Sequence, residues 1–209
     1  MHQALKGLLF DFDGTLLDSF AVHFAAYQRM FARFDIFITK ENLLGAYAPN
    51  WYETYRLLGL PEAVWPQADA YWVEVAAEQT ASLFPGVKQT LRHLHDRFAL
   101  GLVTSGSKPR VLADLEREGI AALFQVVVTG DDVAAPKPDP EGLIRALAAL
   151  ALQPHEVVYV GDAPDDYAMA RAHEVAFVGV PSAFAGSHDG QSYPRLPSVT
   201  ALPSWLGIE

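Results

Sequence analysis

The 209 residues of this chain suffice for one sizeable domain, or for a domain that carries a smaller insert. The formal net charge of −10 argues against nucleic acid or an anionic membrane as a partner, and the absence of cysteine excludes disulfides, thiolate metal sites and cysteine nucleophiles. Hydrophobic residues make up 51% of the chain, but no apolar run reaches membrane-spanning length, so we expect a soluble globular protein. The lack of cysteine fits a cytoplasmic location.

The first predicted element is a short apolar run, GLLF at 7–10, which ends at Asp11. No comparable strand follows before residue 85, and helical patterns dominate this stretch instead. One helical face carries five aromatic residues, Phe20, Phe24, Tyr27, Phe31 and Phe34. We therefore predict an α-helical insert at 16–84 and a second domain that consists of residues 1–15 and 85–209.

From residue 85 onward, helical patterns alternate with short apolar runs. The helices are expected at 86–98, 108–118, 139–151 and 165–173, and the strands within 98–103, 124–128, 157–160 and 175–180. The runs are continuously hydrophobic rather than alternating, which is typical of strands that are buried on both faces of a parallel sheet. The alternation predicts an α/β fold with a doubly wound, mostly parallel, Rossmann-like sheet.

Polar residues gather where the predicted strands end. They are Asp11 and Asp13 after the first strand, Thr104, Ser105 and Gly106 after the second, and Asp162, Asp165 and Asp166 after the fourth; Lys137 comes from a loop before a helix. Ligands of open parallel sheets bind at this carboxyl edge. Acids from two strand ends can bind Mg²⁺, and the hydroxyls and backbone N–H groups of TSGSKP at 104–109 can cradle a phosphate. Lys137 would supply a cation for the same anion, which leaves one acid to act as a nucleophile.

Four motifs carry a resemblance to a known family. DFDGT at 11–15, VTSGS at 103–107, KPDP at 137–140 and GDAPDD at 161–166 resemble, in the same order, the four motifs of the haloacid dehalogenase superfamily of phosphohydrolases. The helical insert after the first motif resembles the cap of the branch that contains phosphoglycolate phosphatase and β-phosphoglucomutase. The resemblance implies a Mg²⁺-dependent phosphatase in which the cap selects the leaving group of a small phosphate ester.

The resemblance also implies a role for each motif residue. Asp11 would attack phosphorus and become an aspartyl-phosphate, and Asp13 would act as general acid and then as general base. The metal would be held by the carboxylates of Asp11 and Asp162 and by the backbone carbonyl of Asp13, and Asp166 would support these ligands without binding the metal itself. The phosphate would be bound by Gly14, Thr104, Ser105, Gly106 and Lys137. For the residue that supports the metal, the spacing of the last motif favours Asp166 over Asp165. Asp165 has a simpler explanation as an acid at the start of a helix.

Five residues of the cap are candidates for substrate contacts: His23, Tyr47, Asn50, Trp51 and Arg56. A histidine at position 23 could touch the acid/base residue, although an ordinary place on an amphipathic helix explains it equally well. The aromatic candidates also have a plain structural explanation, because aromatic residues of a small helical domain mostly pack its own core.

Three other functions compete with that of a phosphatase. A β-phosphoglucomutase-like mutase must bind a second phosphate, but the cap has only four basic residues, Arg29, Arg33, Lys40 and Arg56. A receiver domain also forms an aspartyl-phosphate, but its acid pair precedes that aspartate and it carries no long helical insert. A non-enzymatic α/β binding module is disfavoured because no catalytic position is replaced. We therefore favour hydrolysis of a small-molecule phosphate monoester, by a monomer or homodimer without nucleic-acid or membrane partners.

Overall fold

The computed structural model describes residues 5–48, 51–184 and 192–208, and the chain forms two compact units. The larger unit contains Met1–Asp18 and Leu83–Glu209, and the smaller unit contains Ser19–Ser82. The predicted insert, 16–84, starts three residues earlier and ends two residues later than the smaller unit. We refer to Ser19–Ser82 as the cap unit and to the rest of the chain as the core unit.

The core unit is built around a five-stranded sheet with the order β5–β4–β1–β6–β7, in which neighbouring strands run parallel. The strands are β1 (Gly7–Phe10), β4 (Ala99–Val103), β5 (Val126–Val128), β6 (Val157–Gly161) and β7 (Ala176–Gly179). The central strand β1 is buried along its whole length, which explains its continuous hydrophobicity. The predicted α/β fold with a mostly parallel sheet is confirmed.

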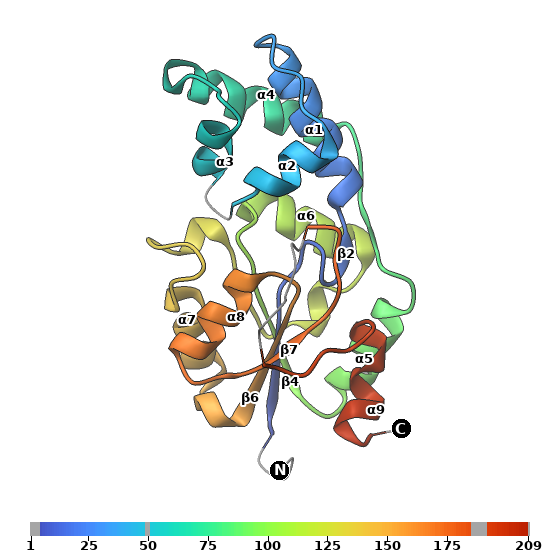
Figure 1. Cartoon of the computed structure of the whole chain (residues 1–209). Helices are drawn as coiled ribbons and strands as arrows, with labels where there is room; N and C mark the ends of the chain where they lie inside the picture. Colours follow the sequence, from blue (N-terminus) through green and yellow to red (C-terminus); the bar gives the residue numbers. More distant parts are fainter. Residues whose placement is uncertain (1–4, 49–50, 185–191, 209) are drawn as a thin grey trace. The chain divides into compact units, whose positions relative to one another are not determined.

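Helices cover both faces of this sheet (Figure 1). On one face, α7 (Glu141–Leu150) and α8 (Pro164–Ala172) bury Leu143 and Met169 against Leu9 and Tyr159 of the sheet. The chain moves toward one edge of the sheet from β1 to β4 to β5, and toward the opposite edge from β5 to β6. Because crossovers between parallel strands are right-handed, the helices that follow β1 and β4 lie on the face opposite to α7 and α8. These helices are α5 (Val87–His95) and α6 (Lys108–Glu118), and α9 (Leu202–Leu206) packs beside α5.

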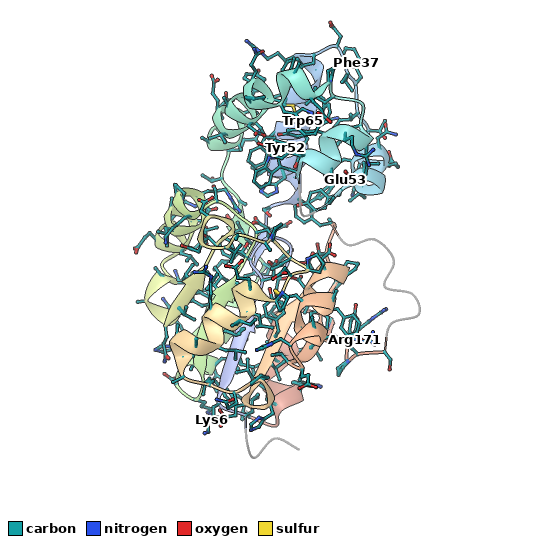
Figure 2. The ribbon with its side chains drawn as sticks, turned by 90° about the vertical axis from the view of Figure 1, so that its left-hand side faces the viewer. Lys6, Phe37, Tyr52, Glu53, Trp65 and Arg171 are labelled. Carbon is teal, nitrogen blue, oxygen red and sulfur yellow. The ribbon has the colours of Figure 1, made fainter. Side chains whose placement is uncertain are left out.

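The described part of the cap unit contains four α-helices, α1 (Phe20–Ala32), α2 (Lys40–Ala46), α3 (Trp51–Leu57) and α4 (Trp65–Ala77). Their core is formed largely by aromatic and branched residues, among them Tyr27, Phe31, Leu43 and Tyr55. Figure 2 shows Tyr52 and Trp65 in this unit, where their rings stack with centroids 5.0 Å apart. The aromatic residues of the cap unit therefore mainly build its own interior.

The two chain segments between the units are β2 (Leu17–Asp18) and β3 (Ser82–Leu83), which form a two-stranded sheet. Short 3-10 turns occur at Glu62–Val64, Ala121–Leu123, Gly130–Asp132, Pro154–Glu156 and Val199–Ala201. None of the helices within the described ranges has the length and apolar character that a membrane crossing requires.

Candidate active site

The motif residues of the core unit meet at the carboxyl edge of the sheet. The backbone hydrogen bonds between neighbouring strands continue one residue beyond β1 and β4. The N–H of Asp11 donates to Val160 O over 2.9 Å, and the N–H of Thr104 donates to Val128 O over 3.0 Å. Asp162 follows directly on β6, next to β1 in the sheet. Parallel strands therefore bring the first, second and fourth motifs to one edge, as expected for a ligand site in this kind of sheet.

Three buried carboxylates form the centre of this site. One oxygen each of Asp11, Asp162 and Asp166 lies within 4.8 Å of the others, and the side chains are almost inaccessible to solvent. Burial raises the pKa of Asp11 well above its ordinary range, and the nearby Asp166 and Asp162 raise it further against the opposing effect of Lys137. Burial and the Asp166 carboxylate likewise raise the pKa of Asp162 to about 7. This crowding of buried oxygen ligands fits a hard divalent cation such as Mg²⁺, because the cation would offset the repulsion.

Lys137 supplies a positive charge beside these acids. Its Nζ donates to Asp11 Oδ1 over 2.6 Å, to Asp166 Oδ1 over 2.8 Å and to the Tyr159 hydroxyl over 2.8 Å. Burial alone would lower the pKa of Lys137, but the two carboxylates outweigh it and raise the pKa well above its ordinary value. The ammonium group therefore stays charged although its side chain is only 8% exposed.

Tyr159 is a residue of this site that the sequence analysis missed. Its hydroxyl accepts from Lys137 and donates to the backbone oxygen of Val103, 2.8 Å away, so it connects the lysine with the end of β4. The only signal in the sequence is a tyrosine inside a fully buried strand, because a buried hydroxyl needs a hydrogen-bond partner.

Asp166 and Asp165 lie in different surroundings. Asp166 Oδ2 accepts from the N–H groups of Asp162 and Ala163, over 3.1 and 3.0 Å, and its Oδ1 accepts from Lys137. The structure thus brings Asp166 into the acid cluster, where it shapes the loop that carries Asp162. Asp165 stands in the first turn of α8 and is not a member of the cluster.

The first motif contributes more than its two acids. The Thr15 hydroxyl donates to Asp162 Oδ1 over 2.9 Å and so orients a carboxylate from the fourth motif. Gly14 has a φ of +84°, and a Cβ there would lie 2.6 Å from Asp162 Oδ2. Glycine is therefore required at position 14 both for the left-handed turn and for the close approach of Asp162.

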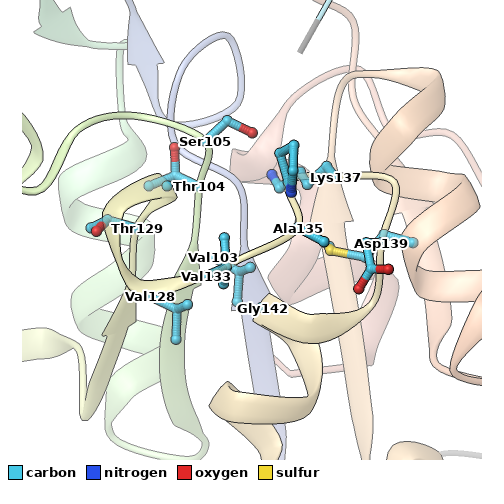
Figure 3. A pocket seen from close by; sticks show the side chains of 13 residues that line it. Val103, Thr104, Ser105, Val128, Thr129, Val133, Ala135, Lys137, Asp139 and Gly142 are labelled. Atoms are coloured by element: carbon cyan, nitrogen blue, oxygen red, sulfur yellow. The ribbon is translucent and has the colours of Figure 1, made fainter. Parts of the chain in front are cut away.

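The predicted phosphate cradle, Thr104–Ser105–Gly106, follows β4 and precedes α6. Figure 3 shows Thr104, Ser105 and Lys137 around a small pocket that Asp139 also lines. The N–H of Gly106 donates to Thr104 Oγ1 over 3.2 Å, so this donor is engaged within the cradle itself. Gly130 supports the cradle from the next loop, because its N–H donates to Gly106 O over 3.0 Å.

We expect Gly130→Ala to lower the free energy of unfolding by about 1–3 kcal/mol, because a Cβ at this position would lie 2.5 Å from the backbone oxygen of Ser105. Backbone atoms cannot move aside as a flexible side chain can. The measurement is urea unfolding. Gly45→Ala serves as the control, since a Cβ at Gly45 in α2 would meet no atom within 4 Å and alanine favours helices. Equal unfolding midpoints for the two variants would contradict the expectation.

Asp13 is paired with an arginine that the sequence analysis did not single out. Arg110 Nη1 donates to Asp13 Oδ1 over 3.1 Å, and its Nη2 donates to Asp13 Oδ2. Arg110 stands in the first turn of α6, one turn before Asp114. No pattern in the sequence pointed to this contact, because 97 residues separate the two partners.

The cap candidates lie in varied surroundings within their own unit. His23 is buried and meets the ring of Trp72 edge-on, with centroids 5.5 Å apart. Tyr47 and Trp51 are exposed at 36% and 45%, and Arg56 forms an ion pair with Glu53 of the same helix. Asn50 lies outside the described residues.

The four basic side chains of the cap unit all contact partners inside that unit. Arg29 pairs with Glu78 and Arg56 with Glu53. The guanidinium of Arg33 lies 4.7 Å from the ring centre of Tyr71, and the ammonium of Lys40 lies 4.8 Å from that of Phe20. Each cation of this unit therefore already has an internal anionic or aromatic neighbour.

Known proteins resemble this chain along most of its length. Residues 8–180 match the model of the haloacid dehalogenase-like hydrolase family. A phosphoglycolate phosphatase of Salmonella typhimurium is 32% identical over 207 residues, which cover 85% of this chain and 82% of the relative. Pyrophosphatase PpaX of Listeria monocytogenes is 30% identical over 201 residues, with 93% and 92% covered.

A solved structure from Lactobacillus plantarum has a similar fold. Its TM-score is 0.86 and its sequence is 22% identical, with 97% of this chain and 99% of the other chain covered. This similarity extends through both units and shows that the fold is shared along nearly the whole chain.

Proposed function

Because this chain belongs to the haloacid dehalogenase-like hydrolase family and is a phosphatase, we propose that it hydrolyses a small organic phosphate monoester through an aspartyl-phosphate, with Mg²⁺ as cofactor. The observation that carries the proposal is the contact of the buried Lys137 ammonium with Asp11, beside two further buried acids. A cation at this place favours the ionised form of Asp11, which is the form that attacks, and attracts the anionic phosphoryl group.

Asp11, Asp162 and the backbone carbonyl of Asp13 would hold the metal ion, and Asp166 would orient its ligands. When bound, Mg²⁺ supplies positive charge that offsets the repulsion among the acids and favours the approach of an anionic substrate. The raised pKa of Asp162, about 7, supports this assignment, because a cation there would favour the ionised form that burial disfavours.

The chain's own residues would divide the reaction into two displacements. In the first, a carboxylate oxygen of Asp11 attacks phosphorus while the bond from phosphorus to the leaving oxygen breaks, and Asp13 donates a proton to that oxygen. In the second, Asp13 takes a proton from water as the water oxygen attacks phosphorus, and the bond to Asp11 breaks. Inorganic phosphate leaves, and both carboxyl groups return to their initial states.

Lys137, Thr104 and the backbone of Ser105 and Gly106 would stabilise the charge on the phosphoryl oxygens during both displacements, with the Gly106 N–H exchanging Thr104 Oγ1 for a phosphoryl oxygen. Lys137 is well suited to this role because Tyr159 and Asp166 hold its ammonium group in one position. Gly14 would contribute through the turn that brings Asp162 close to the first motif.

We also propose that the cap unit selects the leaving group, with His23, Tyr47, Trp51 and Arg56 as candidate contacts. Hydrolysis is favoured over phosphosugar mutase chemistry because the four cap cations already have partners inside the unit, whereas a bisphosphate intermediate needs a cation for its second phosphate. Phosphoglycolate and pyrophosphate, named by the relatives, are the first compounds to test.

A phosphate-release assay over a panel of metabolite monophosphates, pyrophosphate and an aryl phosphate tests this function. We expect turnover of the aryl phosphate and of at least one metabolite with Mg²⁺, and loss of turnover with EDTA that is reversed by excess Mg²⁺. If no compound is turned over faster than by an Asp11→Asn control, the protein is not a phosphatase that uses this site. Isomerisation of a hexose phosphate with little free phosphate would favour the mutase instead.

A further inference from the structure

Arg110 connects the proposed acid/base residue to the helix that follows the phosphate cradle. Its guanidinium donates to both carboxylate oxygens of Asp13. The two side chains are only 24% and 15% exposed, so this pair is shielded from solvent far more than a surface ion pair. A two-pronged contact of this kind restricts both the position of a carboxylate and the rotation of its plane.

Contacts other than Asp13 hold the guanidinium in place. Its Nη1 also donates to Asp114 Oδ2 over 3.2 Å, one turn further along α6. Its Nη2 lies against the cradle, because a Cβ built on Gly106 would stand 2.3 Å from this atom. Gly106 therefore leaves the space that Nη2 of Arg110 occupies, and Asp114 accepts from the other terminal nitrogen, Nη1.

From this geometry we infer that Arg110 is a positioning residue, which holds the Asp13 carboxylate beside the phosphate cradle in the orientation needed for proton transfer. The inference rests on the proposed function, because it concerns the proton transfers assigned to Asp13. A carboxylate has about four lone-pair sites, and a two-pronged arginine occupies two of them, so another can carry the proton that passes to the leaving oxygen and is later taken from water. A general acid must lie within hydrogen-bond reach of its target, and small misplacements of a reacting group are costly.

Arg117 provides a matched control on the same helix. It also donates to Asp114, at the other carboxylate oxygen, and it stands about two turns further along α6 than Arg110. Arg110→Met and Arg117→Met both remove a guanidinium that pairs with Asp114 while keeping an apolar stem. The first of these changes removes the two-pronged contact between Arg110 and Asp13.

The test compares an alkyl phosphate with 4-nitrophenyl phosphate at saturating Mg²⁺, because nitrophenolate leaves without needing a proton. For Arg110→Met we expect kcat on the alkyl phosphate to fall about 10- to 100-fold, with KM changed by less than about threefold. With 4-nitrophenyl phosphate, the first nitrophenolate should be released nearly as fast as in the wild type, as a burst followed by slow turnover. Arg117→Met should have the kinetics of the wild type. Arg110→Lys should remain impaired, because lysine keeps the positive charge but lacks the planar group that donates two parallel hydrogen bonds.

Three results would overturn the inference. A raised KM with unchanged kcat would make Arg110 a substrate-binding residue, and equal losses of burst rate and alkyl turnover would indicate general disruption. Equal kinetics in Arg110→Met and Arg117→Met would show that the contact with Asp13 has no effect on the reaction. Failure of the proposed function is a separate outcome, since the wild type would then release no phosphate from either compound.

Discussion

Replacing Asp11 with asparagine is expected to lower phosphate release by about 1,000-fold or more, because the amide is a poor nucleophile and forms no acyl phosphate. The substitution keeps the size and shape of the side chain. Binding of substrate should therefore change much less than kcat, and no phosphorylated protein should accumulate when the variant is mixed with substrate and Mg²⁺.

The same variant should remain folded. Burial raises the pKa of Asp11 well above its ordinary range, and Asp166 and Asp162 raise it further, which means that the ionised side chain is costly in the metal-free protein. Asparagine removes that cost but weakens one hydrogen bond from Lys137, so we expect the free energy of unfolding to change by no more than about 2 kcal/mol. Urea unfolding without metal measures this change.

Asp165→Asn is the control for Asp11→Asn. It removes one carboxylate from the fourth motif, but Asp165 is not a member of the buried acid cluster. We expect this variant to retain most of the wild-type activity. Asp11→Asn with activity close to that of Asp165→Asn would mean that the nucleophile is not Asp11.

Replacing Lys137 with methionine is expected to damage both activity and stability. Lys137, Asp11 and Asp166 form an ion-pair cluster in which the side chains are 8%, 10% and 2% exposed. Removal of one partner from a buried ion pair leaves uncompensated charge, which costs about 3–5 kcal/mol. The loss of charge stabilisation at the phosphoryl group should lower kcat by about 100-fold or more.

Lys108→Met is the control for Lys137→Met, because it shows what the loss of an exposed lysine does to activity and to the free energy of unfolding. Lys108 pairs with Asp132 in the same unit, but its side chain is 50% exposed, so its removal should cost less than about 1 kcal/mol. Urea unfolding of the two variants, together with phosphate release, makes the comparison. If Lys137→Met unfolds at the same urea concentration as Lys108→Met, the buried acids do not depend on the lysine for stability.

The core unit could be predicted well because its signals are local. The predicted helix at 108–118 has the same limits as α6, since Pro109 suits a first turn and Gly119 adopts the left-handed conformation that ends a helix. The apolar runs contain all five strands within a few residues, because strands buried on both faces must be hydrophobic at every position.

The cap unit was harder to divide into elements. Phe34 was expected on the face of the first helix, but α1 ends at Ala32, and Phe34 packs against the cap core from beyond the helix. The start of α2 is set by Thr39 and Asn42, each of which accepts a hydrogen bond from the other's backbone N–H. Aromatic residues occur throughout this unit, so hydrophobic periodicity alone does not mark where one helix ends.

By itself the sequence determined the parallel sheet and the edge at which its motifs meet, because both follow from apolar runs and from the residues directly after them. Only the tertiary structure decided which side chains touch: Asp13 with Arg110 across 97 positions, and Thr15 with Asp162 across 147. Such contacts depend on where loops from different strands converge and on how deeply the charges are buried. Neither property is encoded in a local pattern, because each arises from parts of the chain that meet only when it folds.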